Sequence, residues 1–393
     1  MSHGLRFLIL NTDYYEFLSW LYAQNPGLQD KSYDEQMRVR MESLFGVADF
    51  YSSNLRKIGH EAWDVYLNNE FMQSRWAKEH GLRSDERQSS SSLTKAFLKS
   101  AAATRLRHLK PIVKLFFHSL NGRTAFSYET LAAQIRHYKP DVLLNQAMDG
   151  HIGHFLREMK SDIPLLVGQI ASPLPSGDDF GCYDLIISSL PNFVEYFRRI
   201  GIPAECHLFG FEPEILSRLA SHKKRIPVSF VGGISRDHQS RFEWLEYLCR
   251  HTDIEVWGYG VDALPQDSWI RKRYKGKAWG LGMYQVLRES KITVNHHIGI
   301  AGSYANNMRL FEATGVGCLL ITDWKVNLDD IFRVGSEVIA YRDPEECVEK
   351  IRQYLEGDSE RNTIASAGQT RVLEHHSYRR RMEELVEIVR PYL

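Results

Sequence analysis

The sequence predicts an α/β protein built from two doubly wound domains that face each other across a cleft. Short apolar runs alternate with helix-compatible segments along most of the 393 residues, which is typical of parallel sheets covered by helices. The runs are apolar throughout rather than alternating, as expected for strands buried on both faces. They end in Asn, Asp, Gly or His, and ligands of such sheets bind where the strands end.

Nine runs are predicted to be strands, and three further regions are predicted to be helical. The strands expected in the first half are 7–10, 141–144, 165–168 and 185–188, and those in the second half are 228–231, 254–257, 292–294, 319–322 and 338–341. The stretch from about residue 14 to 79 is predicted to be helical, as are segments near 95–114 and 192–199, separated in part by a serine tract at 88–92. The polar segment 217–225 is the expected linker. We therefore expect domains at 1–215 and 216–377, with a C-terminal helix at 378–393 that packs back.

Composition excludes several classes of protein. Lys plus Arg and Asp plus Glu are both 49, so the formal net charge is zero and gives no support for a nucleic-acid binder. The five cysteines are widely spaced without a C-x-x-C pair, which argues against a disulfide scaffold or zinc site and favours the cytoplasm. No apolar run approaches the length of a membrane span, so we expect membrane contact to be peripheral at most.

A glycine pair follows the first strand of the second half. Gly232 and Gly233 precede Arg236 and Arg241 and then an amphipathic helix. Glycines permit close approach of backbone to a ligand, and a helix start and two arginines favour an anion. The segment is a candidate phosphate cradle without a Walker motif, although a turn followed by a helix cap explains the pattern about as well.

A second candidate anion site opens a later helix. Asn306 and Asn307 precede Arg309 and Glu312, which are three residues apart and share a helix face. The arginine could hold a phosphate and the carboxylate a diol. A surface salt bridge between the two side chains is the competing interpretation.

Two further patterns are less specific. Residues 258–263 match G-x-G-x-x-A after a strand, but the early Pro265 favours a simple turn over a dinucleotide site. His151 and His154, near Asp149, have a spacing that metals use. No third ligand is evident, so a general base, a substrate contact or an ordinary loop histidine remain open.

The chain resembles CgeB-like (spore-maturation-protein-like) glycosyltransferases. The resemblance is carried by the sequences at 307–313, 317–323 and 341–344, by the tail from Ile364 to Arg381, and by 230–233 with His238 and Arg241. It covers most of the chain, is strongest over 228–382 and is weaker before 140. It implies a GT-B fold of two Rossmann-like domains, with a nucleotide-sugar donor on the C-terminal domain and an acceptor on the N-terminal domain.

The resemblance also implies roles for individual residues. Glu312 would bind the ribose, backbone groups near Asn306 to Arg309 together with Gly233 would bind the diphosphate, and Ala278 and Trp279 could meet the nucleobase. Related retaining enzymes carry a second glutamate eight residues before the ribose-binding one, where this chain has Tyr304. Sugar recognition must then differ from that of these enzymes, and both a retaining and an inverting route stay open.

The chemistry expected on this basis is hexosyl or related sugar transfer to an unknown acceptor, without a metal or a further cofactor. Arg309, Arg241 or Arg236 would stabilise the leaving diphosphate. An inverting route would also need a base, for which Asp13, Asp149 and His151 are the candidates at strand ends. A non-catalytic sugar-nucleotide-binding or assembly protein, and a GT-B epimerase or hydrolase, remain alternatives.

Overall fold

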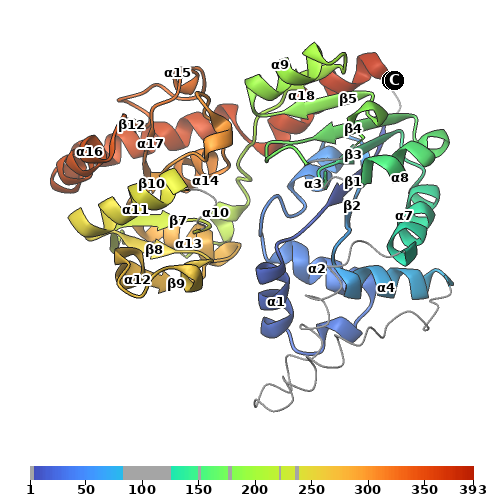
Figure 1. The fold of residues 1–393 in the computed structure, drawn as a ribbon, viewed down its shortest axis with the longest axis horizontal. Helices are drawn as coiled ribbons and strands as arrows, with labels where there is room; N and C mark the ends of the chain where they lie inside the picture. Colours follow the sequence, from blue (N-terminus) through green and yellow to red (C-terminus); the bar gives the residue numbers. More distant parts are fainter. Residues whose placement is uncertain (1–3, 83–124, 149–151, 176–178, 221–222, 235–238) are drawn as a thin grey trace.

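The computed structural model describes residues 4–82, 125–148, 152–175, 179–220, 223–234 and 239–393. They form two lobes, each built on a six-stranded, all-parallel sheet (Figure 1). The predicted α/β class of two doubly wound domains is confirmed. The serine tract and the helix expected near 95–114 lie outside the described residues.

The first sheet has the strand order 2-1-3-4-5-6. Its strands are β2 (Glu61–Tyr66), β1 (Arg6–Asn11), β3 (Val142–Asn145), β4 (Leu165–Gln169), β5 (Leu185–Ser188) and β6 (Ala204–Cys206). Most of their side chains are buried, because helices cover both faces. The helices that accompany this sheet are α1 (Tyr15–Gln24), α2 (Tyr33–Glu42), α3 (Phe50–Lys57), α4 (Glu70–Glu79), α7 (Ala125–Tyr138), α8 (Ile152–Glu158) and α9 (Pro191–Arg199).

The second sheet reads 12-11-10-7-8-9, which is the Rossmann order when counted from its own first strand. Its strands are β7 (Ile226–Val231), β8 (Glu255–Trp257), β9 (Tyr274–Gly276), β10 (Ser290–Asn295), β11 (Leu319–Asp323) and β12 (Ile339–Tyr341). The accompanying helices are α11 (Gln239–His251), α12 (Trp269–Arg273), α13 (Leu281–Glu289), α14 (Arg309–Gly315), α15 (Leu328–Ile331), α16 (Pro344–Glu356) and α17 (Asp358–His375).

The chain crosses between the lobes at two places that lie side by side. The segment after β6 carries α10 (Ile215–Arg218), and Phe211 forms a bridge with Ser377, just before α18 (Tyr378–Val389). Ser377 caps α18 by accepting a hydrogen bond from the backbone N–H of Arg380. Helix α18 then packs against α3 of the first lobe (Figure 1). The C-terminal helix thus returns to the lobe in which the chain begins.

The helical prediction for residues 14–79 is wrong in one place, because β2 lies within that stretch. In β2 the apolar Val65 and Tyr66 are buried, but Glu61 is exposed and Asp64 is charged. The charged residues interrupt the apolar run that marks the other strands, and the pairing with β1 overrides local preference. Strands β6 and β9, of three residues each, were also not predicted.

A second interlobe contact is made by the backbone of Gly280. Its φ is +49°, and the N–H of the next residue, Leu281, donates to the carbonyl oxygen of Ser43 at 3.0 Å. A β-carbon on Gly280 would lie 1.8 Å from that carbonyl oxygen. Only glycine fits at this point of contact, because both the conformation and the space exclude a side chain.

The variant Gly280→Ala is therefore expected to lower stability by about 1–3 kcal/mol through strain and loss of the contact. Gly282→Ala is the matched control, since a β-carbon at Gly282, in α13, meets nothing within 4 Å. Chemical denaturation of both variants measures the difference. Equal stability of the two would contradict the assignment of Gly280 to the interlobe contact.

Candidate functional site

The carboxyl edge of the second sheet gathers polar and charged side chains. In the Rossmann order the connections change direction between β7 and β10, and ligands of such sheets bind in the crevice outside the strand ends at this point. The residues that follow β7, β10 and β11, and those that start α11 and α14, are therefore the candidate site.

Glu312 lies at the centre of this edge and is 5% exposed. Its carboxylate forms an ion pair with Arg309 on the same helix, with Nη1 and Oε2 2.9 Å apart. Its other oxygen, Oε1, accepts a hydrogen bond from the hydroxyl of Tyr284 at 3.5 Å. Burial raises the pKa of Glu312, and Arg309 and Tyr284 oppose that rise. The predicted proximity of Arg309 and Glu312 is confirmed, but the pair is buried rather than on the surface.

Arg309 retains unused hydrogen-bonding capacity. Its Nη2 contacts the sulfur of Met283 at 3.2 Å, while its Nε and Nη1 are buried without a hydrogen-bonding partner in the part of the chain that the structure describes. Nη1 is close to Glu312 but not aligned for a hydrogen bond. Buried polar atoms are nearly always satisfied in folded proteins. This guanidinium group is therefore able to accept an anion without breaking an existing hydrogen bond.

Arg241 supplies a second positive charge at this edge. Its Nε and Nη2 both donate to the carbonyl oxygen of His296, at 3.2 and 2.8 Å. Burial lowers the pKa of Arg241, Asp323 raises it and Arg309 lowers it. Arg241 thus adds a second positive charge to the edge that carries Arg309.

The glycine pair after β7 is packed against the next strand. The N–H of Gly232 donates to the carbonyl oxygen of Trp257 at 3.0 Å, and a β-carbon on Gly233 would lie 2.8 Å from the hydroxyl of Tyr259. Gly258 approaches so closely that its β-carbon would lie 1.8 Å from the carbonyl oxygen of Gly232. The glycines at 258 and 260 thus form the tight turn that the sequence favoured over a dinucleotide site. The approach of Gly233 to a phosphate stays a prediction.

Asn306 and Asn307 join the helix start to its neighbours. The side chain of Asn307 donates to Oδ1 of Asn295 at 2.8 Å and accepts from the N–H of Leu310. The carbonyl oxygen of Asn306 accepts a hydrogen bond from Ser189 of the first lobe at 3.5 Å. Both residues lie at the predicted edge and hold the segment before α14 in place.

Trp279 occupies an aromatic cluster between the lobes. Its ring is stacked on Tyr259, with centroids 5.3 Å apart, and contacts Phe45 and Phe17 edge to face. The ring is 6% exposed, and Ala278 is also partly buried against the apolar core. A nucleobase would have to displace one of these aromatic rings to stack on Trp279, so its predicted role remains untested.

Asp13, just after the end of β1, forms a buried ion pair with Arg40. Its two carboxylate oxygens accept hydrogen bonds from Nη2 and Nε of Arg40, at 2.5 and 3.0 Å. Both side chains are almost fully buried, and the Arg40 guanidinium lies over the ring of Tyr66. An oxygen held in this way is poorly placed to accept a substrate proton. The arrangement favours a structural role for Asp13 over the predicted role as a base.

Three predicted site residues cannot be placed. Asp149, His151 and Arg236 lie outside the described residues. His154 is described, and its Nδ1 lies 3.9 Å from Asp179. Among the described residues, no group of three or more His, Cys, Asp or Glu side chains has the arrangement of a metal site. In the same part of the chain, no helix is both long and apolar enough to cross a membrane.

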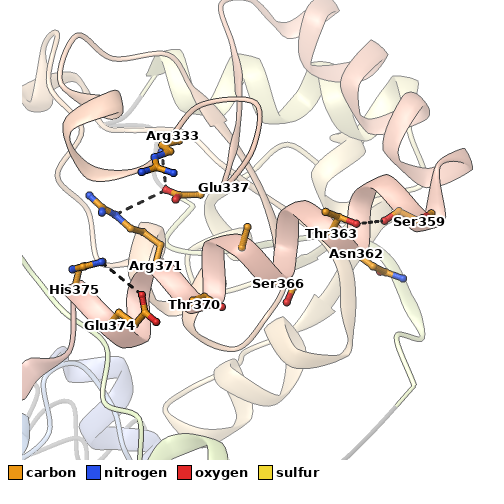
Figure 2. A pocket seen from close by; sticks show the side chains of 11 residues that line it. Arg333, Glu337, Ser359, Asn362, Thr363, Ser366, Thr370, Arg371, Glu374 and His375 are labelled. Carbon is orange, nitrogen blue, oxygen red and sulfur yellow. Dashed lines mark hydrogen bonds and ion pairs between the residues drawn. The ribbon is translucent and has the colours of Figure 1, made fainter.

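A pocket of about 850 Å³ lies elsewhere, along α17 (Figure 2). Two of its charged groups already have partners: Glu337 accepts from the backbone N–H of Arg333 and faces Arg371, which also donates to the carbonyl oxygen of Ile331. Glu337 lies two residues before β12, at the amino edge of the sheet. The pocket is thus remote from the edge at which the candidate site lies.

The sequence interpretation missed three residues of the site. Tyr284 lies on α13, 28 positions before its partner Glu312, and no local pattern signals such a contact. His297 and Asp323 form a hydrogen-bonded pair at the ends of β10 and β11. The signal that could have found the pair is that both residues follow predicted strands that end at the same edge.

Comparisons with known proteins agree with this architecture. Residues 239–387 match the family model described as Glycosyl transferase-like, which confirms the predicted class for the lobe that carries the site. No curated protein matches the chain. The more specific CgeB-like assignment remains a prediction.

Solved structures share the fold over nearly the whole chain. A glycosyltransferase from Rickettsia africae ESF-5 superposes with a TM-score of 0.56 at 10% identity, covering 100% of this chain and 99% of that one. Anabaena Alr3699/HepE in complex with UDP-glucose gives a TM-score of 0.58 at 10% identity, covering 98% and 99%. Its complex with UDP gives 0.57. At such low identity these matches establish the GT-B fold and no more.

Proposed function

We propose that the protein is a glycosyltransferase that moves a sugar from a nucleoside diphosphate sugar to an acceptor. The observation that carries the proposal is the buried Arg309–Glu312 pair at the carboxyl edge of the second sheet. Two guanidinium nitrogens of Arg309 form no hydrogen bond with any described residue. The family match over 239–387 and the GT-B fold support it.

Each group at this edge suits one part of such a donor. The carboxylate of Glu312 can accept hydrogen bonds from the two ribose hydroxyls. Arg309 and Arg241 bear positive charges that suit the diphosphate. The charge on the diphosphate grows as the bond to the sugar breaks, so fixed guanidinium groups lower the barrier by binding the transition state more tightly than the donor.

These two arginines also lead us to propose that the reaction proceeds without a metal ion. The acceptor would bind on the first lobe, where Asp149 and His151 remain the candidate bases. Because a related fold has been solved with UDP and UDP-glucose, UDP-hexoses are the first donors to test. The acceptor is unassigned.

Donor turnover in the presence and absence of acceptors tests the proposal. We expect release of nucleoside diphosphate that requires an acceptor, is unaffected by EDTA and is abolished in Glu312→Ala. Turnover without any acceptor would instead identify a hydrolase or epimerase. Donor binding with no turnover under any condition would identify a non-catalytic binding protein.

A further inference from the structure

His297 and Asp323 form a buried pair that the proposed function has not used. Nδ1 of His297 lies 2.7 Å from Oδ1 of Asp323, and the backbone N–H of His297 donates to the same oxygen at 3.0 Å. Lys325 lies 3.2 Å from the other oxygen, Oδ2. Burial alone would raise the pKa of Asp323, but the hydrogen bond from His297 and the surrounding cations hold it well below the usual range. Asp323 is thus an ionised partner that fixes the orientation of the imidazole ring.

The second ring nitrogen of His297 has no hydrogen-bonding partner among the described residues. The side chain is fully buried, and Nε2 is a buried polar atom without a hydrogen bond in the described structure. Such atoms are uncommon and indicate a missing water, ion or ligand. Because Asp323 accepts the proton on Nδ1, the neutral ring presents Nε2 as an acceptor and the protonated ring presents it as a donor.

The position of the pair follows from its neighbours. Arg241 binds the carbonyl oxygen of His296, the residue before His297, and interacts electrostatically with both Asp323 and Arg309. Arg309 in turn is paired with Glu312. Asn307, two residues before Arg309, donates to Asn295, two residues before His297. The Arg309–Glu312 pair and the His297–Asp323 pair therefore lie at the same edge, and a donor whose ribose and diphosphate occupy the first pair leaves its sugar as the part that can reach the second.

We propose that Nε2 of His297 forms a hydrogen bond with a hydroxyl group of the sugar that is transferred. The inference rests on the proposed function and adds the residue that recognises the sugar. A hydroxyl both donates and accepts, so it matches Nε2 in either protonation state. The phosphate oxygens only accept, and the two arginines already serve them.

Two substitutions distinguish the roles of the two ring nitrogens of His297. In His297→Asn the side-chain amide reaches about as far as Nδ1, so it can still donate to Asp323 but lacks an atom at Nε2. In His297→Gln the amide reaches about as far as Nε2. Calorimetric titrations would use UDP with UDP-glucose, GDP with GDP-mannose and ADP with ADP-glucose, and the variants would be tested with the pair that the wild type binds.

We expect His297→Asn to weaken nucleotide-sugar binding about 3- to 10-fold, the effect of one hydrogen bond, and to change nucleoside diphosphate binding less than about twofold. His297→Gln should restore part of the loss. Equal weakening of both ligands, no change in either, or wild-type binding of the sugar nucleotide no tighter than that of the diphosphate would overturn the inference. Failure of the wild type to bind any of the six ligands would instead overturn the proposed function, and this inference with it.

A measurement on the wild type avoids any dependence on how the variants fold. In protein with ¹⁵N-labelled histidine, the nucleotide sugar should shift the Nε2 resonance of His297, and the nucleoside diphosphate alone should not. The resonance is assigned by its absence in His297→Gln. An Nε2 resonance that the two ligands shift equally would contradict a contact with the sugar.

Discussion

Arg309→Met is expected to lower kcat/KM for sugar transfer about 100- to 1,000-fold, the cost of removing one preorganised group from a developing charge. The guanidinium of Arg309 is buried beside Glu312 with Nε and Nη1 free of hydrogen bonds. Methionine keeps much of the length and apolar bulk of the side chain while removing its charge. Steady-state kinetics with saturating acceptor measures the effect.

Arg371→Met is the matched control for this experiment. Arg371 also lies in the second lobe and faces a buried glutamate, Glu337, but it lines the pocket along α17 rather than the carboxyl edge (Figure 2). Its substitution should leave kcat/KM within about threefold of the wild type, as expected for a side chain that contacts neither substrate. Similar losses in the two variants would show that Arg309 acts through the stability of the lobe and not through the donor.

Asp13→Asn is expected to lower the free energy of unfolding of the first lobe by about 3–5 kcal/mol, because it leaves the charge of Arg40 buried without its partner. Both side chains are nearly inaccessible to solvent, and both carboxylate oxygens of Asp13 bind Arg40. Urea denaturation followed by far-ultraviolet circular dichroism measures the change.

Two comparisons show whether the effect belongs to the buried pair. Glu42→Gln removes a partner from the exposed ion pair with Arg38 and should change stability by less than about 1 kcal/mol. The double variant Asp13→Leu with Arg40→Met should recover a large part of the loss, since no buried charge remains. A loss in Asp13→Asn as small as that in Glu42→Gln would refute the structural role of the pair.

The strands of both lobes were predictable where burial is complete. Runs such as 185–188 and 319–322 are apolar throughout because helices cover both faces of each sheet, and the structure contains β5 and β11 at these places. The C-terminal helix, predicted within 378–393, forms α18 at Tyr378–Val389. Strand β2 was not predictable in the same way, because charged residues interrupt it.

The site was predictable only where its residues are close in the sequence. Arg309 and Glu312 share one helix face, so their spacing alone indicated a contact. Tyr284, and the pair of His297 with Asp323, depend on which strands and helices become neighbours in the folded lobe. The partner of Asp13, Arg40, lies 27 residues away on α2. A sequence pattern predicts where a strand ends. It does not show which side chain from another element contacts the residue at that end.

Titration of UDP and the other nucleoside diphosphates into the wild type, Glu312→Ala and Glu337→Ala tests the central claim most directly. Glu337 is the matched control, a buried glutamate of the same lobe that precedes β12. We predict that the wild type and Glu337→Ala bind the same diphosphate with similar affinity, and that Glu312→Ala binds it at least about tenfold more weakly, as two lost hydrogen bonds to a charged group require. Unchanged binding in Glu312→Ala would contradict a donor site at this edge of the second sheet.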